Sequence, residues 1–154
     1  MIVILPGSYD PVTLGHLELI KKAAKLYDTV HVVVFINPDK EYTFSTEERV
    51  KMLRLAAEGL GNIKVGCSNG LVVDYMREHG IEKIIKGYRN ERDLEYERRQ
   101  AEYNFRHGGY ETELWQADPI AQNISSTKAR ELIRAGGDLS EILPQKVISY
   151  INNH

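Results

Sequence analysis

Two short apolar runs near the start of the chain are rich in β-branched residues. They cover residues 2–5 and 30–36, and polar residues barely interrupt them. Runs of this kind are typical of strands that are buried on both faces of a parallel sheet. Between them, residues 17–26 place apolar side chains at helical intervals. The pattern therefore predicts a β-α-β unit with a right-handed crossover.

The alternation of strands and helices continues along the chain. A capping box at 45–48 predicts the start of a second helix. Further strands are predicted at 63–67, 82–86 and 112–115, and further helices through 71–76, over 92–105, after Thr127 as far as 135, and after Pro144 as far as 151. We see no linker or repeat, so we expect a single domain over residues 1–154. Its predicted class is α/β, with a Rossmann-like five-stranded parallel sheet flanked by helices and a C-terminal helical segment.

Composition limits the class of protein. The chain has 154 residues, of which 42% are hydrophobic and 27% charged, as in globular proteins. The formal net charge of −2 provides no overall positive field, so we expect neither nucleic acid nor a membrane as partner. The first residues read as a strand rather than a signal peptide, and a cytoplasmic location is expected. Cys67, the only cysteine, excludes an intrachain disulfide and is expected to be a small core residue.

Groups that bind phosphate follow several of the predicted strands, where ligands of parallel α/β sheets bind. They are a histidine, cations, small hydroxyls and glycines, namely Ser8, Gly15, His16, Lys40, Lys86, Gly87, Arg89 and residues 125–127. The last of these precede a helix, whose N-terminus adds free N–H donors and partial positive charge. The set predicts a site that stabilises charge on phosphates rather than one that supplies a nucleophile.

Several other kinds of site find no support in the sequence. No Ser-His-Asp set is implied by spacing, and no pair of histidines has the spacing of metal ligands. Neither a P-loop nor a GxGxxG fingerprint occurs. We therefore assign no metal ligand to the protein.

Three ordered motifs resemble those of the bacterial phosphopantetheine adenylyltransferase family, within the nucleotidyltransferase superfamily. Residues 5–16, LPGSYDPVTLGH, resemble the family's first turn and its TxGH element. Residues 86–89 (KGYR) and 93–97 (DLEYE) resemble its RGxR and DxEYE block, and residues 124–127 (ISST) its third motif. The similarity extends over nearly the whole chain. It implies transfer of the adenylyl group of ATP to 4′-phosphopantetheine, which yields dephospho-coenzyme A and pyrophosphate in coenzyme A biosynthesis.

The resemblance also implies the roles of individual residues. The catalytic residues would be His16, which stabilises the α-phosphate, Lys40, which bridges it to the attacking phosphate, and Arg89. The residues that would bind phosphopantetheine are Ser8, Lys40, Val72 and Lys86. Those that would bind ATP are Ser8, Tyr9, His16, Gly87, Tyr88, Arg89, Glu97, Ala121, Gln122, Asn123, Ile124, Ser125, Ser126 and Thr127. Mg²⁺ is expected with the triphosphate, held mainly by phosphate oxygens and water, and a homo-oligomer, by resemblance a hexamer, is expected.

Three positions depart from the family's pattern. Lys86 stands where arginine is usual, which keeps the charge but loses the bidentate geometry, so we expect a weaker or differently angled hold on the acceptor phosphate. Tyr9 replaces phenylalanine and adds a hydroxyl that needs a partner. Leu94 replaces an aromatic residue, which we interpret as a packing change.

Two other functions stay open at this point. One is a different transferase of the superfamily, using CTP or a nicotinamide mononucleotide acceptor, which would be expected to carry different second and third motifs. The other is a non-catalytic nucleotide-binding module, against which the presence of His16, Lys40 and Arg89 argues. Plain structural roles are also consistent with some positions, since Ser125 and Ser126 suit helix caps. His31, within a strand, is expected to be structural.

Overall fold

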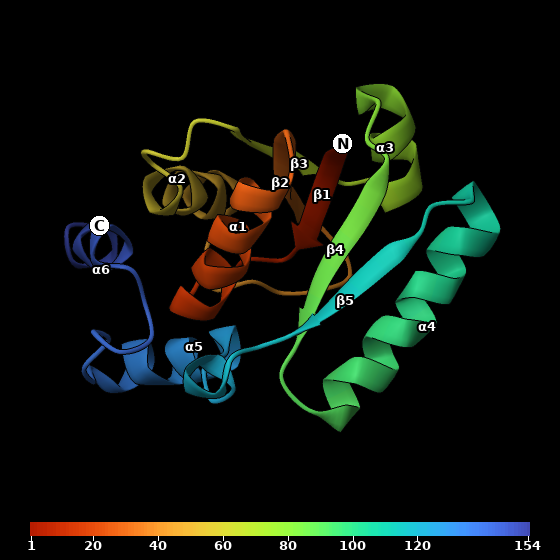
Figure 1. Cartoon of the computed structure of the whole chain (residues 1–154). Coiled ribbons are helices and arrows are strands. Elements are labelled where there is room, and N and C mark those ends of the chain that lie inside the picture. Colours follow the sequence, from red (N-terminus) through yellow and green to blue (C-terminus); the bar gives the residue numbers. More distant parts are fainter.

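A parallel sheet of five strands runs through the middle of the molecule, and the computed structural model describes all residues from 1 to 154 (Figure 1). The strands are β1 (Ile2–Gly7), β2 (Thr29–Phe35), β3 (Ile63–Ser68), β4 (Lys83–Tyr88) and β5 (Thr112–Gln116). Their order in the sheet is β3-β2-β1-β4-β5. The chain thus leaves β1 toward one edge and later returns to its other side with β4, which makes the end of β1 a topological switch point.

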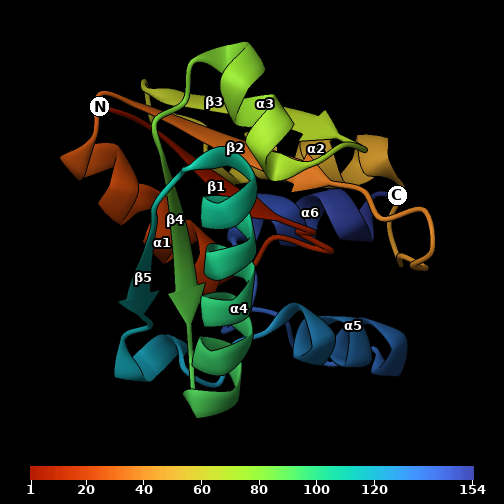
Figure 2. The same ribbon diagram turned by 90° about the vertical axis from the view of Figure 1, so that its right-hand side faces the viewer.

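Six α-helices surround the sheet: α1 (Leu14–Leu26), α2 (Thr46–Ala56), α3 (Val72–His79), α4 (Glu91–Gly108), α5 (Ser126–Ala135) and α6 (Gln145–Asn152). Helices α1, α2 and α6 cover one face, and α3 and α4 cover the other (Figures 1 and 2). Helix α5 lies beyond the carboxyl ends of the strands (Figure 1). The predicted α/β class and five-stranded parallel sheet are confirmed.

The strands bury side chains on both faces, as their apolar runs predicted. In β2, Val30, Val32 and Val34 belong to the larger core under α1, α2 and α6. Val33, which points the opposite way, packs with Met76 of α3 in a second core. Successive side chains of a strand alternate between the faces, so a central strand without polar interruptions requires helices on both sides.

Several elements extend further than the sequence pattern predicted. Strand β4 continues through Tyr88, beyond the predicted end at Lys86, because Gly87 and Tyr88 still pair with Trp115 and Gln116 of β5. Helix α1 begins at Leu14, three residues before its first strongly buried position. The predicted capping box of α2 is confirmed: Ser45 and Glu48 each accept the other's backbone N–H.

Two smaller predictions have different outcomes. Cys67 is exposed, which corrects the expectation of a core residue: it lies on β3, one of the two edge strands of the sheet. His31 is buried within β2, in line with a structural role. None of the helices combines the length and apolar character that crossing a bilayer requires.

Asp10 ties the turn after β1 to the segment before α2. Its side chain is buried, and its two carboxylate oxygens accept the backbone N–H groups of Thr43 and Phe44, each at 2.9 Å. Hydrogen bonds to a charged acceptor are stronger than neutral ones and leave a large penalty when the acceptor is removed. Asp10 therefore fixes where the segment between β2 and α2 meets the end of β1.

We expect Asp10→Asn to lower the free energy of unfolding by about 1–3 kcal/mol, because the amide nitrogen faces an N–H donor and the charge is lost. Urea unfolding followed by circular dichroism measures this change. Asp39→Asn, an exposed position in the same segment, is the matched control. Equal unfolding midpoints for the two variants would contradict the role given to Asp10.

Candidate active site

A cavity of about 600 Å³ opens at the carboxyl ends of β1, β4 and β5. Its wall is formed by the turn after β1, the first turns of α1, the N-terminal half of α4 and the segment from β5 to α5. Most of the residues predicted for the site line it: Ser8, Tyr9, His16, Lys40, Lys86, Gly87, Tyr88, Arg89, Glu97, Ala121, Ile124, Ser125, Ser126 and Thr127. The fold thus brings together motifs that are more than 100 residues apart.

Three predicted residues do not line the cavity. Val72 starts α3 and packs against the core cluster on the opposite face of the sheet. Gln122 donates its amide to the carbonyl of Ala117 and supports the loop that leads to α5. Asn123 follows it in the same loop. A direct contact between these three residues and a substrate stays a prediction.

His16 is held by a reciprocal cap at the start of α1. The side chain of Thr13 accepts the backbone N–H of His16, and the imidazole Nδ1 of His16 accepts the backbone N–H of Thr13 at 3.0 Å. This is a capping box in which histidine takes the place of the usual glutamate. The cap fixes both the helix start and the orientation of the imidazole ring.

The cap also determines where the imidazole carries its proton. A backbone N–H can only donate, so Nδ1 must be the accepting nitrogen and the proton of the neutral ring lies on Nε2. Burial in the cavity wall, assisted by the positive charges of Lys86 and Arg89, lowers the pKa of His16 to about 4. His16 is therefore a neutral N–H donor at pH 7 rather than a cation.

Tyr9 supports the ring of His16 from inside the turn. It is the one non-glycine residue with a positive φ, 48°, and its hydroxyl donates to the carbonyl of Leu5 at 2.8 Å. This bond supplies the partner that the tyrosine at this position needs. The ring centroids of Tyr9 and His16 lie 4.9 Å apart, edge to face. A Cβ on Gly7 would come within 3.0 Å of the Tyr9 ring, so the glycine makes room for it.

Lys86 and Glu97 form a partly buried pair on the wall between β4 and α4. The ammonium of Lys86 donates to the carbonyl of Pro6 at 3.1 Å and lies 3.5 Å from Oε2 of Glu97. That separation is an ion-pair contact that is too long for a good hydrogen bond, and Oε2 has no hydrogen-bond partner. Burial raises the pKa of Glu97, against the opposing charge of Lys86. The two side chains thus attract each other by charge, while Oε2 of Glu97 accepts no hydrogen bond.

The other two cations predicted for the site, Arg89 and Lys40, have different neighbours. Arg89 is held by Asp93, which accepts from its Nε at 2.9 Å and from its backbone N–H at 3.1 Å. Lys40 takes part in no ion pair; its ammonium lies 5.5 Å from the ring centroid of Tyr42. Lys40 therefore lies on the wall of the cavity with no carboxylate paired to its ammonium.

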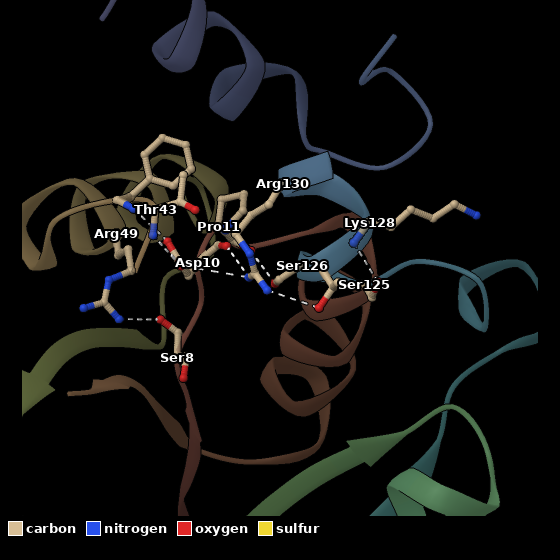
Figure 3. A network of polar contacts seen from close by, with 11 residues as sticks. Ser8, Asp10, Pro11, Thr43, Arg49, Ser125, Ser126, Lys128 and Arg130 are labelled. Carbon is tan, nitrogen blue, oxygen red and sulfur yellow. Dashed lines mark hydrogen bonds and ion pairs between the residues drawn. The ribbon is translucent and has the colours of Figure 1, made fainter. Parts of the chain in front are cut away.

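The start of α5 contacts the turn between β1 and α1. Ser125 is the helix N-cap and accepts the N–H of Lys128, while the hydroxyl of Ser126 donates to the carbonyl of Pro11 at 2.8 Å (Figure 3). The predicted cap roles are confirmed for Ser125, and Ser126 uses its hydroxyl for a contact between elements. Backbone N–H groups in the first turn of helix α5 remain as donors for an anion.

Sequence reasoning assigned no role to three residues that hold the site in place. Asp93 orients Arg89, Thr13 orients His16, and Arg130 donates to the carbonyl of Asp10 at 2.8 Å. The Thr13–His16 spacing of three residues before an apolar helix is a local signal that could have been found. Arg130 has no such signal, because its partner is a backbone carbonyl 120 residues away.

The arrangement can bind and activate phosphates without a protein nucleophile. Around one cavity it offers a neutral N–H donor, a helix N-terminus and six cationic side chains, Lys22, Lys40, Lys86, Arg89, Arg92 and Arg130. No group of three or more His, Cys, Asp or Glu side chains gathers in the way a protein-bound metal ion needs. The donors suit an anion with several phosphates, whose developing charge they would stabilise.

Comparisons with known proteins agree with this chemistry. Residues 4–132 match the model of the family described as Cytidylyltransferase-like. The phosphopantetheine adenylyltransferase of Clostridium novyi (strain NT) is 40% identical over 153 residues, which cover 99% of this chain and 95% of that relative.

We expect the imidazole of His16 to stay neutral, with its proton on Nε2, throughout the range from pH 5.5 to 8 in the ligand-free protein. Imidazole ¹H–¹⁵N correlation spectra, with the signal assigned by His16→Ala, measure both the tautomer and the titration. Because the folded pKa lies below the ordinary 6.5, the unfolded chain takes up the proton first. The stability due to this group is therefore lost as the pH falls from 6.5 toward about 4. A midpoint near 6.5 would contradict this interpretation.

Proposed function

The chain belongs to the Cytidylyltransferase-like family, and we propose that it transfers the adenylyl group of ATP to 4′-phosphopantetheine, forming dephospho-coenzyme A and pyrophosphate. The observation that carries the proposal is the meeting of the three motifs around one cavity whose wall presents His16, Lys40 and Arg89. The relative of 40% identity over nearly the full length, named for that activity, supports the choice of substrates.

The reaction needs no general base from the protein. The acceptor is a phosphate monoester whose oxygens are already ionised at neutral pH. One of these oxygens attacks the α-phosphorus of ATP, a new P–O bond forms, and the bond to the bridging oxygen breaks, so that pyrophosphate leaves. The protein's part is to align the two phosphates and stabilise the charge that develops between them.

Each group on the wall has a part in this transfer. The Nε2–H of His16 donates to a non-bridging oxygen of the α-phosphate, where negative charge grows. Lys40, which has no ion-pair partner, bridges the attacking phosphate and the α-phosphate. Lys86 binds the acceptor, Arg89 the phosphates of ATP, and the start of α5 the leaving pyrophosphate through its backbone N–H groups.

Mg²⁺ belongs to the proposal as a companion of the triphosphate. The donor set of the cavity wall is cationic and amide-rich, which fits a phosphate chain better than a bare metal ion. The ion would neutralise the β- and γ-phosphates and would be held by phosphate oxygens and water. A homo-oligomer, with a hexamer as its expected form, and a cytoplasmic location stay predictions.

We expect the purified protein to release pyrophosphate with ATP plus 4′-phosphopantetheine and Mg²⁺. The assay crosses ATP and CTP with 4′-phosphopantetheine and nicotinamide mononucleotide. Turnover with another pair alone would favour a different transferase of the family. Binding of ATP without pyrophosphate release from any pair would indicate a non-catalytic nucleotide-binding module.

We expect His16→Ala to lower kcat by about 10²–10³-fold, as loss of one transition-state donor does, while the Kd for ATP changes by less than about threefold. His16→Gln places an amide N–H near the position of Nε2, so it should retain more turnover than His16→Ala. Stopped-flow turnover and calorimetric ATP binding measure the two quantities. Equal losses in kcat and ATP affinity would point to a ground-state role for His16.

A further inference from the structure

Arg49 is a buried cation without a carboxylate partner. Only 1% of the residue is exposed, it takes part in none of the ion pairs, and its Nε has no hydrogen-bond partner. A charge removed from water is costly unless other groups compensate for it. Arg49 does not line the cavity, so the mechanism above leaves it without a role.

The contacts of Arg49 reach two segments that carry predicted substrate-binding groups. Its Nη1 donates to the carbonyl of Ser8 at 2.9 Å, which fixes the backbone of a residue on the cavity wall (Figure 3). Its guanidinium carbon lies 3.8 Å from the ring centroid of Tyr42, a close cation–π contact. A weaker contact, from Nη2 to the hydroxyl of Thr46 at 3.3 Å, anchors the side chain to its own helix.

Tyr42 in turn organises the segment that carries Lys40. Its hydroxyl accepts the backbone N–H of Asn37 at 2.9 Å, which closes the segment into a loop. The ammonium of Lys40 lies 5.5 Å from the centroid of the same ring. The ring on which Arg49 rests is therefore the support of the loop that presents Lys40 to the cavity.

We propose that Arg49 is a positioning residue that sets the distance between Ser8 and Lys40, acting through the Ser8 carbonyl and the Tyr42 ring without touching substrate. The proposal rests on the proposed function, in which Lys40 bridges the attacking phosphate and the α-phosphate, and on the expected binding of phosphopantetheine by Ser8. A planar guanidinium suits this task, because it donates in its plane to a carbonyl while its face packs on an aromatic ring. The ammonium of lysine has no planar face that could pack on the ring while it donates to the carbonyl.

The kinetic test compares Arg49→Met with Arg54→Met, which removes an exposed arginine from the same helix. We expect Arg49→Met to lower kcat/KM for 4′-phosphopantetheine by about 10–100-fold, the size of effect that a misplaced binding group has. Arg54→Met should leave it within about twofold, as surface substitutions usually do. Arg49→Lys keeps the charge but can make only one of the two contacts at a time. Its kcat/KM should therefore lie between those of Arg49→Met and Arg54→Met.

A double-mutant cycle with Lys40→Ala separates positioning from a general structural effect. If Arg49 acts through Lys40, the loss in kcat/KM for the double variant will be clearly smaller than the product of the two single losses. Losses that multiply, or a normal kcat/KM for Arg49→Met despite lower stability, would overturn the proposal. If Arg49→Met does not fold, the cycle is run with Arg49→Lys.

A substrate-free readout keeps this proposal separate from the proposed function. Amide hydrogen exchange by NMR compares Asn37, held by Tyr42, with Thr43 and Phe44, held by Asp10. We expect Arg49→Met, or Arg49→Lys, to speed exchange at Asn37 while Thr43 and Phe44 stay protected. Unchanged exchange at Asn37, or equal acceleration at all three amides, would overturn the positioning role even if no substrate pair gave turnover.

Discussion

The turn between β1 and α1 is held through its backbone by side chains from distant parts of the chain (Figure 3). Arg49 binds the carbonyl of Ser8, Arg130 that of Asp10, and Ser126 that of Pro11. Buried backbone carbonyls must find donors, and a tight turn cannot supply them from its own residues. The donors come from α2 and α5, so satisfying the turn also fixes both helices relative to it, and the first turn of α5 lines the cavity.

Helix α1 depends on the same turn, since it starts directly after it. The Thr13–His16 cap can form only if the chain enters the helix in the direction that the bound carbonyls impose. The position of Nε2 thus depends on the contacts that Arg49, Ser126 and Arg130 make with the backbone of the turn. A donor held in this way needs no reorganisation when charge develops, which is the main source of electrostatic catalysis.

The three predicted cations of the cavity differ in how they are paired with carboxylates. Asp93 binds Arg89, Glu97 lies near Lys86, and Lys40 has no carboxylate at all. His16 lies near Lys86 and Arg89 and is neutral because its burial, assisted by these two positive charges, lowers the pKa of its imidazole to about 4. A neutral donor adds little attraction for bound ATP, so its contribution grows mainly as charge shifts to the α-phosphate oxygens.

How far sequence predicts such a site depends on whether the partners of a residue are local. The strands, the α2 capping box and the placement of Lys40 and Arg89 at strand ends followed from patterns within a few residues. The end of β4 was predicted too early because Gly87 reads as a turn, whereas pairing with β5 carries the strand through it. No role could be assigned to Arg49 from the sequence, because its partner is a backbone carbonyl 41 residues away and every residue has such a carbonyl.

Lys86, the clearest departure from the family's pattern, follows the same physical logic. Its ammonium has three N–H donors; one binds the Pro6 carbonyl at the end of β1, and Glu97 attracts the charge from 3.5 Å. The remaining N–H can donate to a phosphate oxygen. Lys86, which lies on β4, can therefore keep its hydrogen bond to β1 while it binds the acceptor. An arginine fork would give the phosphate two parallel bonds, but its planar donors could not point at Pro6, Glu97 and the ligand from one atom. Under the role proposed for Lys86, the substitution exchanges bidentate recognition of the phosphate for a link between the ligand and the end of β1.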